Sequence, residues 1–473
     1  MLKFWLPFWA ISTLFALVSA AQHQDLREKP AIWNTGEPKP TDSTSLLSAF
    51  KSGKVSGHFR YFYSSTANQG SLTDYYAHAL GGGLRFESGN FHGFSGAISG
   101  FYIFNLGSSD LQARDTETGA LNRYEAGLFD ITDPGQTREI NRLEEFFIRY
   151  KKEGLKLTFG RQLMNTPFIN LQDGRMRPTA AQGLVVDYSF AKNQQLMLSW
   201  IYGMAPRGTG RWYSLEESIG IYPVGVNRNG NKSEYAGNTS SQGALLANYK
   251  ITSGAGLSID IWNMWLENVM NTALIQIDGE RKSGIFKIQY GVQGSWQIKS
   301  GNGGNPLPQM SFYDNTKPVY TAGFKVGMKT QKYTVTLNGN RISTGGRFLM
   351  PREWGRDFFY TFMPRERNEG FGDVWAVVFK TSAELSRSTE IRLDAGNFWL
   401  PDVRDYALNK YGMPSYFQLN ADLRHKFTGF FQGMEAQLLW VYKWNTGDIY
   451  NDKKYLINKA DMWLLNVVVN YRF

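Results

Sequence analysis

The chain has 473 residues, a formal net charge of +10 and no cysteine. Aromatic residues make up 15% of it and hydrophobic residues 42%, yet the mean hydropathy is negative, so apolar residues are dispersed among polar ones. Disulfides and thiolate metal sites are therefore excluded. Beyond the amino-terminus no apolar run approaches the roughly 20 residues of a transmembrane helix, which excludes a helical membrane protein.

The first residues have the pattern of a secretory signal. One early cation, Lys3, precedes an apolar stretch at 4–18 and small residues at 19–21. We expect a cleaved signal peptide over 1–21, with an amino-terminal membrane anchor as the alternative. Residues 22–52 lack alternation, and we expect them to form a periplasmic leader.

From residue 53 onward, apolar and polar residues alternate in segment after segment. In "GKVSGHFRYFY" (53–63), Val55, Phe59 and Tyr61 oppose His58 and Arg60. This pattern predicts about eighteen strands with one oily and one wetter face. Their expected spans are 53–64, 74–88, 91–105, 141–152, 154–162, 182–190, 194–203, 240–251, 254–265, 268–278, 284–298, 317–329, 331–342, 371–380, 388–397, 414–427, 432–444 and 461–473.

The connections between these strands alternate in length. Short turns alternate with longer segments, apart from one short outward connection near Leu266. The last strand, "DMWLLNVVVNYRF", alternates up to Phe473, so we expect it to pair with the first strand. The pattern predicts an all-β fold, a single transmembrane antiparallel β-barrel over 53–473, with short periplasmic turns and long external loops partly folded into the lumen. A soluble all-β fold is the alternative. The longer segments are 106–140, 163–181, 204–240, 299–316, 343–370, 398–413 and 445–460.

A barrel of this width encloses an aqueous channel unless loops narrow it. Its expected inner face carries more cations than acids, which favours the passage of anions. The alternative is that these arginines pair with acids and stiffen the wall. The inward residues include His58, Arg60, Arg85, Arg149, Lys325, Arg392, Asp422, Arg424, Glu435 and Lys443.

Three long stretches resemble the OprD family of outer-membrane porins. The first is "LTFGRQLMNTPFINLQDGRMRPTAAQG" (157–183), with a Gly-Arg-Gln entry, an Asn-Thr-Pro and an Asp-x-Arg-x-x-Pro. The others are "FLMPREWGRDFFYTFMPRERNEG" (348–370) and "LPDVRDYALNKYGMPSYFQLNADLRHKF" (400–427). The first two strands are also similar to those of the family, so the resemblance runs from about residue 53 to the end.

The resemblance implies a monomeric or loosely trimeric channel whose third and seventh external loops constrict the pore. It also implies a ladder of basic residues that guides carboxylates. The substrate-binding residues that it implies here are Arg60, Arg161, Asp173, Arg175, Arg177, Arg352 and Arg356. Arg161 shares parity with Leu157 and Phe159, so it must lie beyond the hydrocarbon, or Gly160 must mark a bulge that turns it inward.

We therefore expect a passive porin in the outer membrane of a Gram-negative bacterium. Its solutes would be amino acids, short peptides or organic acids, and it would need no cofactor, metal or nucleic acid. One alternative is an oligosaccharide porin, in which Trp354, Phe358, Phe359 and Tyr360 would stack on sugars. Others are a plugged scaffold barrel and an outer-membrane enzyme, although no Gly-x-Ser-x-Gly nucleophile elbow is present.

Overall fold

The computed structural model describes residues 30–33, 42–136, 140–172, 174–254, 256–365 and 367–473. The expected signal peptide over 1–21 and Asp173 lie outside the described residues. None of the helices among the described residues is long and apolar enough to cross a membrane.

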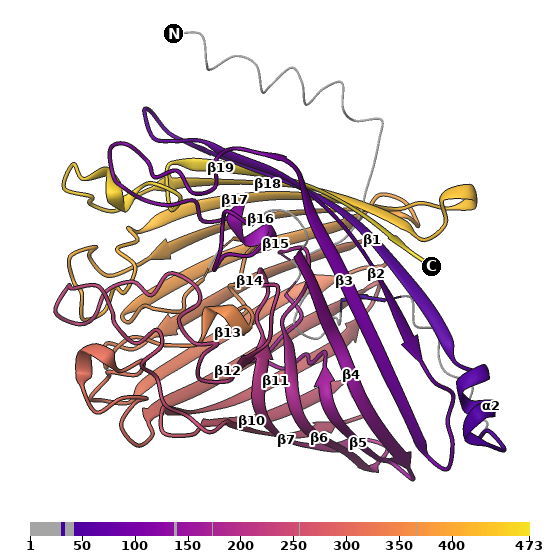
Figure 1. The fold of residues 1–473 in the computed structure, drawn as a ribbon. Helices are drawn as coiled ribbons and strands as arrows, with labels where there is room; N and C mark the ends of the chain where they lie inside the picture. Colours follow the sequence, from indigo (N-terminus) through magenta and orange to yellow (C-terminus); the bar gives the residue numbers. More distant parts are fainter. Residues whose placement is uncertain (1–29, 34–41, 137–139, 173, 255, 366) are drawn as a thin grey trace.

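Eighteen long antiparallel strands close into one barrel (Figure 1). A two-residue strand, β8 (Tyr213–Ser214), pairs with β7 inside one of the long loops. The barrel strands are β1 (Lys54–Asn68), β2 (Tyr75–Glu87), β3 (Phe94–Ser108), β4 (Ile140–Lys152), β5 (Leu155–Gln162), β6 (Ala180–Ala191), β7 (Gln194–Ala205), β9 (Ala244–Thr252), β10 (Leu257–Leu266), β11 (Met270–Ser283), β12 (Phe286–Lys299), β13 (Val319–Lys329), β14 (Tyr333–Ile342), β15 (Val374–Glu384), β16 (Thr389–Trp399), β17 (Tyr416–Lys426), β18 (Met434–Asn445) and β19 (Met462–Arg472).

Each of the expected strands overlaps one strand of the barrel, so the fold prediction is confirmed. The largest differences are at strand ends. β1 continues past residue 64 to Asn68, because its last residues still pair with β19 as far as Met462. β11 similarly continues to Ser283, which pairs with Phe286 of β12. The residues at these strand ends are mostly polar, so the alternation of apolar and polar residues ends before the backbone ladder does.

The barrel closes between its first and last strands, as predicted. β1 and β19 pair from His58 opposite Arg472 to Asn68 opposite Met462. Gly57 and Phe473 exchange two backbone hydrogen bonds of 2.8 and 3.1 Å. A Cβ atom at Gly57 would lie 2.1 Å from the Phe473 ring, so glycine is needed for the aromatic carboxy-terminus to cover this point of the seam.

The wall has an apolar outer face and a polar inner face. Large hydrophobic side chains are exposed all around the outside, as a lipid-facing surface requires. Each of the eighteen barrel strands is bonded on both sides, so the wall has no free edge. The exposed side chains include Phe59, Leu84, Phe146, Phe159, Val292, Tyr320, Trp375, Phe379 and Leu393, whereas Ser56, Arg60, Arg85, Asn338, Gln418 and Arg424 are among those buried on the inside.

Two external loops fold into the lumen, which confirms this part of the fold prediction. The described residues of the third loop (163–179) and of the seventh loop (343–373) are mostly buried. Phe168 and Ile169 of the third loop form one apolar cluster with Phe348 and Trp354 of the seventh loop and with residues of the wall. This packing fixes both loops across the middle of the barrel.

Short helical segments lie in the connections. The helix α2 (Leu46–Lys51) sits at the end of the barrel where the short turns lie (Figure 1), and Gly89 of the β2–β3 turn donates a backbone hydrogen bond of 2.8 Å to Ala49. The 3₁₀ turns are η1 (Ala126–Leu128), η2 (Pro308–Met310), η3 (Arg352–Trp354), η4 (Gly429–Phe431) and η5 (Lys453–Tyr455).

One part of the expected leader packs against the barrel wall from inside. Ile32 and Trp33 are buried in an apolar cluster that includes inward-facing Phe62 and Phe101. These two residues of the expected leader therefore lie inside the barrel. A lone Ile-Trp pair among polar residues carries no alternation that could have shown this.

Candidate functional site

A small basic cavity lies where the third and seventh loops meet the other external loops. Its volume is about 70 Å³, and no aspartate or glutamate is among the described residues that line it. The lining cations are Arg123, Arg175, Arg207, Arg352, Arg365, Arg367, Lys443 and Lys459, and the aromatic residues are Tyr124, Tyr222, Phe371 and Tyr411. We call this space the constriction cavity.

The guanidinium groups around the constriction cavity are held mainly by neutral acceptors. Arg207 donates to the Tyr222 hydroxyl at 3.2 Å and to the Arg352 carbonyl at 2.7 Å. The side-chain oxygen of Gln172 accepts hydrogen bonds from both Arg207 and Arg367. These bonds fix the directions of the side chains but leave their positive charges in place.

Neighbouring charge and burial act in the same direction on two arginines of the seventh loop. Burial, together with repulsion from Arg175, lowers the pKa of Arg365 to about 9. Burial, together with repulsion from Arg207 and Arg352, lowers the pKa of Arg367 to about 9. An anion in the cavity would relieve this repulsion, so the arrangement favours negatively charged occupants.

Lys459 adds a group that titrates in the neutral range. It comes from the last external loop (446–461), and its ammonium group donates to the Gly412 and Lys454 carbonyls at 3.3 and 2.8 Å. Burial, together with the positive charges of Arg123 and Lys454, lowers its pKa to about 7. The charge of the constriction cavity therefore depends on pH.

Arg175 and Arg352 are the two predicted residues that line the constriction cavity. Arg175 donates to the Gly174 carbonyl at 2.7 Å. Arg352 differs because its Nε lies 3.3 Å from Glu369, and its guanidinium carbon lies 4.1 Å from the ring centre of Tyr411. Its charge is thus partly balanced within the protein.

Arg177 is directed away from this cavity, toward β1 and β4. It forms a two-point ion pair with Glu144, one contact being 2.7 Å, and lies 2.8 Å from the His58 ring nitrogen Nδ1. Glu144 also accepts from Arg142 at 2.8 Å. Arg60 is nearby on β1 and donates to Asn470 at 3.0 Å. Arg177 and Arg60, which were both predicted to bind solute, therefore lie in the lumen but are bonded to residues of the barrel wall.

Arg161 is on the outer face of the barrel. It lies opposite Phe146, and Phe159 lies opposite Ile148; these three hydrophobic side chains are exposed on the outside. Directly opposed residues of an antiparallel pair point to the same face. The Arg161 guanidinium stacks over Trp212 at 4.7 Å. The prediction that Arg161 belongs to the constriction is wrong, and Gly160 does not turn it inward.

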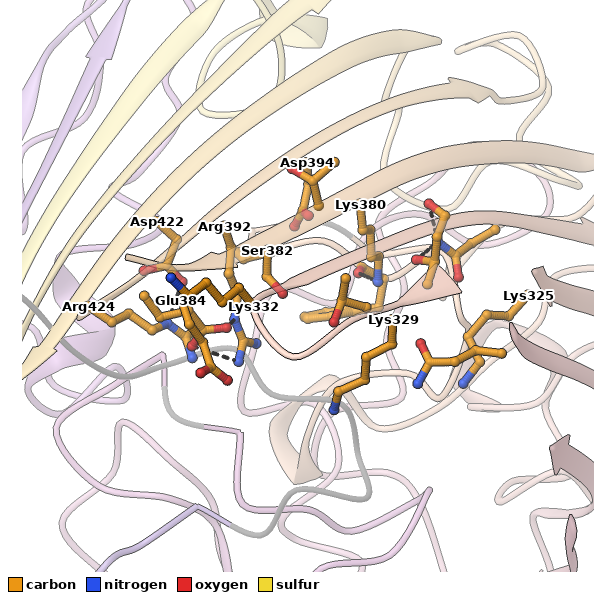
Figure 2. Close-up of a pocket in the computed structure, with 18 of the residues that line it drawn as sticks. Lys325, Lys329, Lys332, Lys380, Ser382, Glu384, Arg392, Asp394, Asp422 and Arg424 are labelled. Atoms are coloured by element: carbon orange, nitrogen blue, oxygen red, sulfur yellow. Dashed lines mark hydrogen bonds and ion pairs between the residues drawn. The ribbon is translucent and has the colours of Figure 1, made fainter. Parts of the chain in front are cut away.

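Arg356 lines a second, larger cavity toward the short-turn end, with a volume of about 640 Å³. Figure 2 shows charged side chains from neighbouring strands converging on it. Several of its cations have acidic partners: Lys325 lies 2.7 Å from Asp278, and Arg424 lies 2.6 Å from Asp422. Further labelled residues are Lys329, Lys332, Lys380, Ser382, Glu384, Arg392 and Asp394.

Sequence reasoning missed five cations of the constriction cavity: Arg123, Arg207, Arg365, Arg367 and Lys459. Arg365 and Arg367 lie within the family-like stretch 348–370, and this resemblance was the sequence signal that could have identified them. The direction of a side chain within a loop cannot be read from parity, and Arg207 and Lys459 lie in loops outside the family-like stretches.

The fold is that of a large porin-type barrel. The sequence matches no protein-family model and no curated protein. Among solved structures, the chain is similar to that of Pseudomonas aeruginosa OpdK, which was solved with vanillate. The TM-score is 0.68 and the sequence identity is 12%, and the match covers 90% of this chain and 99% of that one. The chain is also similar to Acinetobacter baumannii OccAB4, with a TM-score of 0.69 at 12% identity, over 89% and 98% of the two chains. The suspected likeness to OprD-type porins is thus confirmed for the fold.

Proposed function

We propose that this chain is an outer-membrane porin of a Gram-negative bacterium for passive, selective diffusion of small carboxylate-bearing solutes. The observation that carries the proposal is the constriction cavity, in which eight cations face a narrow space with no acid among the described lining residues. Amino acids, short peptides and organic acids are the solute classes in view. The proposal includes no chemical step and needs no cofactor.

Arginine suits this task because its planar fork can grip a carboxylate through two hydrogen bonds. Release then depends on having several weak sites in series. The larger cavity, with Lys325, Lys329 and Lys380 among its cations, offers further weak sites on the way to the short-turn end. The structural neighbour OpdK was solved with vanillate, a carboxylate, which supports this solute class for the fold.

The aromatic residues of the sugar alternative are largely packed against protein. Trp354 is fully buried and donates from its indole nitrogen to Ser218 at 2.8 Å. Phe358 and Phe359 pack on each other with ring centres 4.8 Å apart. This packing leaves little free ring surface for sugars, so we favour carboxylates.

The test is planar-bilayer conductance of the refolded mature chain in asymmetric salt. We expect anion preference in the native chain and its loss in the double variant Arg365→Ala/Arg367→Ala, because two cations leave the constriction cavity. A matched control is Arg281→Ala/Lys282→Ala, which removes the same charge from exposed positions at the short-turn end of β11.

Three outcomes would count against the proposal. Equal selectivity in both double variants would overturn the assignment of the constriction. Stronger block of the current by an oligosaccharide than by an amino acid would favour the sugar porin. A folded barrel that conducts no ions would favour the plugged scaffold.

A further inference from the structure

A short piece of the amino-terminal region lies inside the barrel, although it precedes the first strand. Trp33 has only 6% of its surface exposed, and Ile32 has 7%. They pack in one apolar cluster with Phe62 of β1 and with Leu171 and Met176 of the third loop. Trp33 therefore lies between the barrel wall and the loop that bounds the constriction cavity.

Trp33 contacts a charged group of the lumen. The Arg177 guanidinium carbon lies 4.7 Å from the Trp33 ring centre and 4.2 Å from that of Phe101. The Trp33 and His58 rings meet edge to face, with centres 6.2 Å apart. Arg177 is thus enclosed by two aromatic rings while it pairs with Glu144. Such cation–π contacts strengthen when water is excluded.

The next described residues in the chain begin at residue 42. They include the helix α2, which lies on the other side of the barrel rim from Trp33. Phe50 of α2 stacks on Phe86 with ring centres 6.2 Å apart and planes 5° apart. Phe86 shares the parity of exposed Leu84, so it points outward. The chain is therefore inside the lumen at Trp33 and on the outer side of the wall at Phe50. The contacts of Trp33 and of Phe50 thus lie on the two faces of the wall near β1 and β2.

We propose that residues 30–33 are a fixed part of the pore lining, and that Trp33 narrows the lumen beside β1–β4 and positions the third loop. The proposal rests on the proposed porin function where it concerns ion flow. A bulky indole against Arg177 and Met176 keeps water and solute from the wall side of the third loop. The open path is thereby restricted to the part of the lumen that holds the two cavities.

The absence of cysteine from the sequence allows a clean accessibility test. Single thiols would be introduced by Ile32→Cys and, as a matched control in the same region, by Thr44→Cys at an exposed position. Refolded barrels would be labelled with a charged, water-soluble maleimide. We expect the thiol at position 32 to react at least about tenfold more slowly than the thiol at position 44, because labelling of a buried thiol requires local opening. In urea the two rates should become equal.

Conductance supplies an independent readout. We expect Trp33→Ala to raise the single-channel current by about 1.5-fold, since current grows with the open cross-section of a pore. Trp33→Phe keeps a ring over Arg177 and should stay near the native value. Equal labelling at positions 32 and 44 would overturn the placement in the lumen, and an unchanged current in Trp33→Ala would overturn the narrowing.

Failure of the porin proposal would look different. If neither the native chain nor Trp33→Ala conducts while the thiol of Ile32→Cys stays protected, residues 30–33 belong to the lumen of a closed barrel. The porin function would then be wrong, whereas the placement of Trp33 would be supported.

Discussion

Arg175 and Arg177 stand two residues apart in the third loop, yet their surroundings differ in charge. Arg177 is clamped by Glu144 and His58 and covered by aromatic rings. Arg175 lines the constriction cavity beside other cations and donates to a backbone carbonyl. One basic loop thus supplies two kinds of arginine, one that fixes the loop to the wall and one that lines the constriction cavity.

The largest expected effect is the loss of the wall contact. Arg177→Ala leaves buried Glu144 without one of its two arginine partners, and breaking a buried pair costs about 3–5 kcal/mol. Arg175→Ala should change the free energy of unfolding by less than about 1 kcal/mol, because it relieves repulsion among cations. Urea unfolding of both variants measures the difference. Equal destabilisation would show that the two arginines do not differ in role.

The strands and the constriction could be predicted to different extents. The strands were predictable because lipid outside and water inside impose alternation on each segment from β1 to β19. Parity also indicated the outward direction of Arg161, although the family resemblance suggested a place in the pore. Arg367 and Lys459 could not be found in this way. Their positions depend on how long loops pack together, and no local periodicity records that packing.

A pH titration would test how far the charge of the constriction cavity controls ion selectivity. With the pKa of Lys459 lowered to about 7, this group is charged below pH 7 and neutral above it. Anion preference should therefore fall as the pH rises through this value, with a midpoint near 7. Reversal potentials in asymmetric salt measure this change. The neighbouring charges are Arg123, Lys454 and Asp452.

Lys459→Met should remove this step in selectivity. The matched control is Lys453→Met, in the same loop, which removes a cation that pairs with Glu117 at 2.7 Å on the surface. The control should keep the step. A midpoint near neutral pH that persists in Lys459→Met would assign the titration to another group and leave Lys459 without a part in selectivity.

The smallest effect is expected at Arg161, the arginine on the outside. Its guanidinium stacks over Trp212 and donates to Gln182 at 3.2 Å, on the face that carries Phe159. Arg161→Ala should leave ion selectivity unchanged and cost about 0.5–1 kcal/mol of stability, the usual contribution of an exposed cation–π contact. Bilayer recordings and urea unfolding of the same preparation provide both values. A change in selectivity as large as that of Arg365→Ala/Arg367→Ala would return Arg161 to the pore, which would require β5 to pair with β4 in a register shifted by one residue.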